Sequence, residues 1–157
     1  MRSASTVIDR SSRDKTAELL RHLISGQITN FDFEEQLPSS MDAAVKAITS
    51  SAWCFYDDFE KHKLKGNKAL SKDLKKKLAR WIMFLYTDLE YEWPPISAPG
   101  LRPLNHSLIS RLLGNPAKER KFMIFGEYEV WPFISKKAFL DATKIPRLLA
   151  GTRRVSS

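Results

Sequence analysis

Residues 41–59 read MDAAVKAITSSAWCFYDDF and carry the clearest helical pattern of the chain. Apolar side chains recur in it at intervals of three or four residues, at Met41, Val45, Ile48, Ala52, Phe55 and Phe59. This spacing places them on one face of an α-helix, and Ser39 or Ser40 can cap its N-terminus. The segment therefore predicts an amphipathic helix with a buried apolar face.

Residues 71–89 carry a second pattern of the same kind. Ser71 is a suitable cap for the helix N-terminus. The apolar face consists of Leu74, Leu78, Trp81, Ile82, Leu85 and Leu89. Two amphipathic helices bury their apolar faces most simply by packing on each other. We expect the core of this pair to include Ile48, Phe55, Trp81 and Leu85.

Weaker signals predict further helices on both sides of this pair. Residues 12–26 combine a Ser cap, leucines at helical spacing and a final glycine, and residues 29–37 form a short helical turn with its own caps. The prolines and glycine of residues 94–103 predict an irregular connection. A short helix follows within residues 105–113 and ends before a Gly and a Pro.

The C-terminal third has a different residue pattern, which favours strands. Residues 121–125 and 128–133 are rich in aromatic and β-branched side chains and flank Gly126 and Glu127. Such runs favour strands, so we predict an antiparallel β-hairpin, followed by a terminal helix that Ser135 caps. The predicted fold class is α+β, with a predominantly helical core, a small C-terminal hairpin and a terminal helix.

The length of 157 residues suits one domain. We predict a single globular domain at 12–146, between a flexible N-terminus at 1–11 and a flexible basic tail at 147–157. The single cysteine, Cys54, indicates a reducing compartment. Neither a signal-peptide pattern nor the roughly 20 apolar residues of a membrane span occur. We therefore expect a cytoplasmic protein without membrane contact.

The formal net charge of +8 favours acidic partners, such as nucleic acid or an acidic protein surface. A candidate nucleic-acid-binding set consists of Lys65, Lys68, Lys72, Lys75, Lys76 and Arg80. A solvated helix face explains the same lysines more simply. The aromatic rings of this region belong to the predicted buried face, whereas proteins that bind single strands expose rings beside a basic groove. Nucleic-acid binding is therefore the alternative function.

Acidic residues gather after each of the two long helices. Asp57 and Asp58 lie at the end of the first helix, and Asp88 and Glu92 lie at and beyond the end of the second. Acids are unfavourable at helix C-termini, which suggests that a partner contacts them. The same four residues are the candidate set for a metal-dependent hydrolase, our second alternative. An antiparallel helix pair would hold the two clusters about 25 Å apart, which argues against a shared metal.

Other signs of catalysis are weak. Cys54 lies among aromatic residues, where a small semi-buried filler is commoner than a nucleophile. His22, His62 and His106 lack metal-binding spacing. The glycines form neither a phosphate loop nor a dinucleotide fingerprint. We expect no catalysis, no metal and no cofactor.

Several short strings resemble a group of small, uncharacterised bacterial cytosolic proteins. They are Tyr56-Asp57-Asp58, Leu64-Lys65-Gly66, Ala69-Leu70-Ser71, the stretch 80–85 (RWIMFL), the stretch 88–94 (DLEYEWP), the stretch 126–133 (GEYEVWPF) and, more faintly, the stretch 26–30 (GQITN). Together the matched regions span roughly half of the chain. Proteins of this kind are similar to the immunity proteins encoded beside contact-dependent or polymorphic toxins.

The resemblance implies a protein-binding module that neutralises a partner toxin by steric occlusion. The predicted partner-binding set combines acids and aromatics expected to be exposed: Asp57, Asp58, Glu90, Tyr91, Glu92 and Trp131. An extended chain at residues 90–93 would point its two acids to one side and its two aromatic rings to the other. Immunity proteins against nuclease toxins tend to be acidic, but this chain is basic, so its toxin is expected to present an acidic face.

Overall fold

A computed structural model describes residues 7–56, 59–104 and 107–145. In these ranges the chain forms seven α-helices and four 3₁₀ turns, and it forms no strand or sheet. The α-helices are α1 (Arg10–Ile24), α2 (Asn30–Gln36), α3 (Ala43–Ala52), α4 (Lys72–Leu85), α5 (Leu108–Leu112), α6 (Asn115–Met123) and α7 (Lys136–Thr143). The 3₁₀ turns are η1 (Trp53–Phe55), η2 (Gly66–Lys68), η3 (Pro99–Leu101) and η4 (Tyr128–Val130).

The predicted α+β class is wrong, because the residues of the predicted hairpin form helix and turns instead of strands. The first predicted strand contains the end of α6, and the second contains the 3₁₀ turn η4. Gly114, with a φ of +76°, ends α5, and Pro116 lies in the first turn of α6. Proline in a first turn starts a helix without losing a hydrogen bond, so the Gly-Asn-Pro sequence joins two helices instead of ending one.

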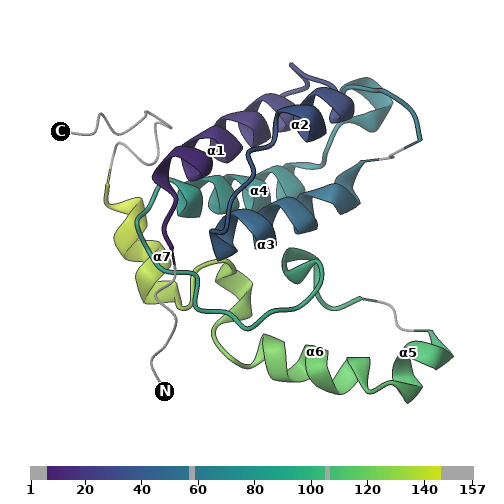
Figure 1. Cartoon of the computed structure of the whole chain (residues 1–157), viewed down its shortest axis with the longest axis vertical. Helices are drawn as coiled ribbons and strands as arrows, with labels where there is room; N and C mark the ends of the chain where they lie inside the picture. Colours follow the sequence, from purple (N-terminus) through teal and green to yellow (C-terminus); the bar gives the residue numbers. More distant parts are fainter. Residues whose placement is uncertain (1–6, 57–58, 105–106, 146–157) are drawn as a thin grey trace.

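Helices α1, α3 and α4 form the body of the molecule (Figure 1). The body's core contains Ile48, Trp81 and Leu85, each fully buried as predicted, while Phe55 is half-buried. Helix α3 starts at Ala43 and ends at Ala52, so Met41 lies before the helix and Phe59 lies after it. Met41 and Phe59 are consequently exposed, to 76% and 93%, and their predicted burial is wrong.

Side-chain caps set the helix starts. Ser71 caps α4 as predicted, and Thr29 and Asp32 form a capping box at α2. Asp9 caps α1, which begins at Arg10, before the predicted start. Asp42 caps α3 in place of the predicted serines. The buried Asp42 carboxylate therefore has two roles, because it caps α3 and also pairs with a buried cation.

That cation is Arg13, whose guanidinium is 1% exposed. Its Nε donates to Asp42 Oδ2 at 2.6 Å, and its Nη1 donates to the carbonyl oxygens of Thr87 and Leu89 at 2.9 Å. The carbonyls follow the end of α4, while Asp42 begins α3. One side chain of α1 therefore joins the ends of both other body helices, and its charge pairs with the buried Asp42 carboxylate.

Aromatic contacts attach the C-terminal part of the chain to the body. The rings of Trp81 and Trp131 meet edge to face, with centroids 5.1 Å apart. Gly100 lies against both rings, and a Cβ added to it would come within 2.3 Å of Trp81. Trp93 donates from Nε1 to the Pro132 carbonyl at 3.1 Å.

Among the described residues, no helix is long and apolar enough to cross a membrane.

Candidate protein-binding surface

The structure separates the members of the predicted partner-binding set. Glu90 and Glu92 are exposed and the neighbouring Tyr91 is buried, so the acids and the ring point to opposite sides, as the extended pattern predicted. Trp131 is 1% exposed, and its Nε1 donates to the Tyr91 hydroxyl at 3.1 Å. Burial also raises the pKa of Tyr91. The expectation that these two rings are exposed is therefore wrong. Asp57 and Asp58 lie outside the described residues.

A different surface exposes large apolar side chains. Helix α5 has only five residues, and Ser107 caps it by accepting from the Ser110 amide. The aliphatic side chains of α5 and of its C-cap residue are between 68% and 87% exposed: Leu108, Ile109, Leu112 and Leu113. They lie at helical spacing, so they share one face. An apolar face of this kind normally packs on a core, but here it points to solvent.

Helix α6 extends this surface. Its outward residues Ala117, Arg120, Lys121 and Ile124 lie three or four positions apart and, with Met123, line a shallow hollow of about 460 Å³. Ile124 is 80% exposed, and Phe125 after the helix is 55% exposed. We call the exposed residues of α5, α6 and Phe125 the α5–α6 surface.

Charge on the α5–α6 surface has one sign. Its exposed charged residues are Arg111, Lys118, Arg120 and Lys121. The single acid of residues 107–125 is Glu119, which is 5% exposed and faces the interior. The α5–α6 surface thus combines exposed aliphatic and cationic side chains, and it matches a partner that has apolar groups and carboxylates.

Buried polar contacts hold α6 on the rest of the protein. Arg102 Nη1 donates to Glu119 Oε2 at 2.7 Å, and the Leu104 amide donates to the same oxygen at 3.0 Å. The Tyr128 hydroxyl accepts from the Arg102 amide and donates to the Pro99 carbonyl. Burial raises the pKa of Tyr128 to about 12. On the apolar side, Phe122 packs against Trp93 at 5.0 Å between ring centroids. These contacts fix the inner side of α6 and leave its outer side free to bind.

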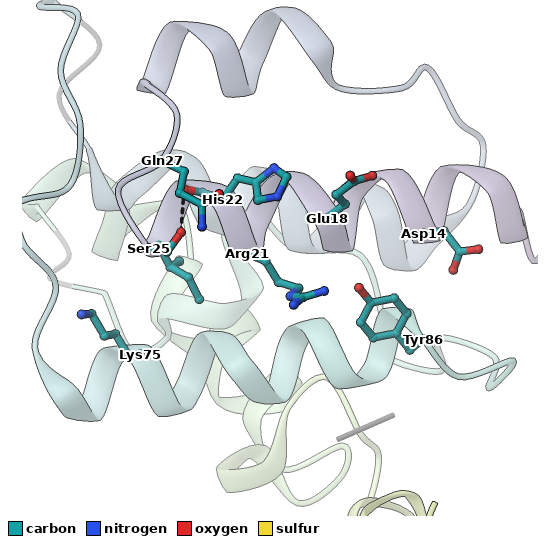
Figure 2. Close-up of a pocket in the computed structure, with 9 residues that line it drawn as sticks. Asp14, Glu18, Arg21, His22, Ser25, Gln27, Lys75 and Tyr86 are labelled. Atoms are coloured by element: carbon teal, nitrogen blue, oxygen red, sulfur yellow. Dashed lines mark hydrogen bonds between the residues drawn. The ribbon is translucent and has the colours of Figure 1, made fainter. Parts of the chain in front are cut away.

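A second concave region lies between α1 and α4, with a volume of about 740 Å³ (Figure 2). Figure 2 shows Arg21 reaching from α1 toward α4, and Lys75 at the end of the groove near Ser25. Asp14 and Tyr86 line the opposite end. We call this region the α1–α4 groove. Its cations and carboxylates are thus separated along its length.

The predicted basic set is only partly exposed. Five of its members are exposed: Lys65, Lys68, Lys72, Lys75 and Lys76. Arg80 is half-buried, and its Nε donates to the Trp131 carbonyl at 2.8 Å. Burial lowers the pKa of Arg80. Arg80 therefore serves the fold, and we remove it from the candidate nucleic-acid-binding set.

The groups considered for catalysis do not converge in the described part of the chain. Asp88 is exposed and pairs with Arg10 at 2.9 Å. Cys54 is exposed on η1, so its predicted role as a semi-buried filler is wrong. Within the described ranges, no three His, Cys, Asp or Glu side chains are placed to hold a metal ion. The predicted separation of the two acidic clusters involves Asp57 and Asp58, outside those ranges.

No family model, curated protein or solved structure matches this chain. The resemblance to immunity proteins stays a prediction.

The sequence predicted the helix at α5 but not the exposure of its apolar face, because its apolar spacing is the same as that of a core helix. The sequence features that could have indicated an exposed helix are its short length, the glycine and proline that follow it, and the four cations and one acid of its segment.

Proposed function

We propose that this protein is a protein-binding module of the immunity or antitoxin type, which neutralises a partner toxin by covering part of the toxin's surface. The observation that supports this proposal is the exposed aliphatic face of α5, where four large side chains are at least 68% exposed. Exposed apolar residues scattered singly need no explanation, but a contiguous group is typical of an interaction site. Burying that face in a complex removes apolar area from water and stabilises the complex.

The proposed partner presents an apolar patch bordered by Asp and Glu. In the proposed complex, the exposed cations of the α5–α6 surface would lie at the rim of the interface: Arg111, Lys118, Arg120 and Lys121. Rim charges mainly steer association and select the partner, while the apolar centre provides most of the affinity. The net charge of +8 likewise favours a toxin with an acidic face.

The experiment compares two exposed leucines. The wild-type protein captures partners from a bacterial lysate, and each captured protein is purified, titrated and tested for toxicity with and without this chain. Leu112→Asp places a charge in the α5 face, where the native side chain is 87% exposed. We expect affinity to fall by at least about 30-fold, since interface anchors contribute roughly 2 kcal/mol or more. Protection from the toxin should fall in parallel.

Leu140→Asp on α7 is the matched control, because Leu140 is also exposed, to 55%, and lies on a different helix. It should bind and protect like the wild type. Equal binding by Leu112→Asp and wild type would remove the α5–α6 surface from the proposal. A captured protein that is harmless when expressed alone would contradict the immunity role.

A further inference from the structure

The hollow on the outer side of α6 has a lining that suits one kind of side chain. We call this space, of about 460 Å³, the α6 hollow, and it is lined by Ala117, Arg120, Lys121, Met123 and Ile124. Three of these residues are apolar, two are cationic and none is acidic. Ile124 is 80% exposed. The α6 hollow therefore offers apolar contact and positive charge within one small space.

The α6 hollow has room for a large side chain, because Ala117 contributes only a methyl group to it. Ala117 is exposed in the first turn of α6, so a longer side chain at this position would extend into the hollow. Met123 is half-buried and packs against the core, so it lines the hollow from a supported position. Figure 1 shows α6 along one edge of the molecule, with α5 at its N-terminal end.

The inner side of α6 is fixed, so the α6 hollow exists before a partner binds. Glu119 is 5% exposed and accepts from the Arg102 guanidinium and the Leu104 amide. Phe122 is 2% exposed and packs on Trp93. A preformed site avoids part of the entropic cost of ordering the interface, which leaves more of the contact energy for affinity.

The side chains around the α6 hollow favour an aromatic guest over an aliphatic one. A methionine thioether such as that of Met123 makes favourable contacts with aromatic rings. A guanidinium such as that of Arg120 stacks on a ring face through cation–π attraction. Neither of these gains is open to an aliphatic side chain. Aromatic residues also bury the largest areas, roughly 150–250 Å² each, and are the commonest anchors of protein interfaces.

The charge around the α6 hollow favours acids beside that ring. In residues 107–125 the only acid is the buried Glu119. The next acids along the chain are held by Lys136, whose amide donates to Glu127 Oε2 at 3.3 Å and whose ammonium pairs with Glu129 at 2.8 Å. Carboxylates of a partner therefore find cations at the α6 hollow, where lysines or arginines of a partner would be repelled.

We propose that the α6 hollow receives one aromatic side chain of the partner protein, carried on an acidic segment. The ring lies against Met123 and Ile124, the Arg120 guanidinium stacks on its face, and a neighbouring carboxylate of the partner pairs with Lys121. This inference rests on the proposed protein-binding function, and it adds the chemistry by which the α5–α6 surface selects its partner.

Nuclear magnetic resonance titration of the isotope-labelled full-length chain tests this proposal. The probe is a synthetic peptide in which one tryptophan stands between runs of glutamate. We expect the amide signals of Ala117, Lys121 and Ile124 to shift with a dissociation constant of about 1 mM or lower, the order expected for one anchor with flanking charges. The same peptide with alanine in place of tryptophan should bind at least about 10-fold more weakly. Equal binding of the two peptides, or shifts confined to other helices, overturns the proposal.

Two variants separate the contributions of shape and charge. Ala117→Trp fills the hollow from within and should weaken peptide binding at least about 10-fold. Ala79→Trp, at an exposed alanine of α4, is the matched control and should bind like the wild type. A double variant, Arg120→Glu with Lys121→Glu, should weaken binding about 2- to 30-fold, the range for two exposed ion pairs. It should in turn bind a peptide in which lysines replace the glutamates. Unchanged binding by Ala117→Trp would show that the ring lies elsewhere.

The α5 variant distinguishes this inference from the proposed function. Leu112 does not line the α6 hollow, so Leu112→Asp should bind the peptide like the wild type while it loses the captured toxin. If the peptide does not bind and toxin capture still depends on Leu112, the inference about the hollow falls and the proposed function stands. If the peptide binds as expected and no captured protein is toxic, the hollow stands as an aromatic-binding site and the immunity role falls.

Discussion

Helices α4 and α5 show the same apolar spacing and opposite burial. On α4, Leu78, Trp81 and Leu85 are at most 1% exposed, whereas Leu108 and Leu112 on α5 are 77% and 87% exposed. Helix α4 has fourteen residues and packs along α1 and α3. Helix α5 has five residues and packs mainly on α6. Apolar periodicity therefore predicts that a helix forms, and the surrounding elements decide whether its apolar face is covered within the chain.

The protein has two buried ion pairs that lie in different regions. Arg13 and Asp42 join three helix ends inside the body, while Arg102 and Glu119 attach α6 from outside it. In each pair both side chains are at most 7% exposed, so removal of one partner leaves an uncompensated charge in a poorly hydrated place. The two pairs offer a direct way to disturb the body and the α5–α6 unit separately.

The largest expected effect is that of Asp42→Ala. It leaves the Arg13 guanidinium without its carboxylate and removes the cap that accepts from the Ala44 amide at 2.9 Å. We expect a loss of about 3–5 kcal/mol in the free energy of unfolding, measured by urea denaturation.

Glu119→Ala is the companion variant. Hydrogen exchange should show that the amides of α6 lose protection while those of α1 and α4 keep it. Uniform loss of protection in Glu119→Ala would show that α6 and the body unfold as one unit.

Leucine truncation compares the two helix faces directly. Leu85→Ala opens a cavity at a fully buried position and should lower the free energy of unfolding by about 2–5 kcal/mol. Leu112→Ala removes the same atoms at a position that is 87% exposed, and its effect should stay within about 0.5 kcal/mol. Thermal or urea unfolding of both variants checks this. Similar losses in both would mean that the α5 face is covered in the free protein.

The smallest expected effect concerns Tyr128, which links η4 to the connection before α5. Tyr128→Phe leaves the Arg102 amide without its acceptor and should lower the free energy of unfolding by about 1–3 kcal/mol at neutral pH.

The pH dependence of stability provides a second measurement. Burial raises the pKa of Tyr128 to about 12, above the value near 10 of an unfolded tyrosine. The unfolded chain therefore loses this proton first, so the stability from the neutral phenol is full below about pH 10 and falls from there toward pH 12. Tyr128→Phe should reduce this alkaline loss, and Tyr91, whose pKa is also raised, should retain part of it. An unchanged alkaline loss in Tyr128→Phe would contradict the burial of this hydroxyl.

Much of the helical body could be predicted from sequence. The apolar spacing around Ile48 and Trp81 predicted α3 and α4, Ser71 predicted the start of α4, and Thr29 predicted the start of α2. The alternation at residues 90–93 predicted that the two acids and the two rings point to opposite sides, but it did not predict that the rings are buried. These features succeed because they depend on contacts between residues a few positions apart, which the chain forms wherever the segment lies.

The candidate sites could not be predicted in the same way. Tyr91 and Trp131 are forty residues apart and bury each other, so neither position alone indicates that the other ring covers it. The first predicted strand instead contains the end of α6, which starts next to Pro116, although the strand propensity of these residues is high. Exposure of the α5 face and of Phe59 depends on which elements pack nearby. Spacing along the chain determined the helices, while burial is a relation between distant elements, so only the tertiary structure decided which apolar and charged side chains are left at the surface.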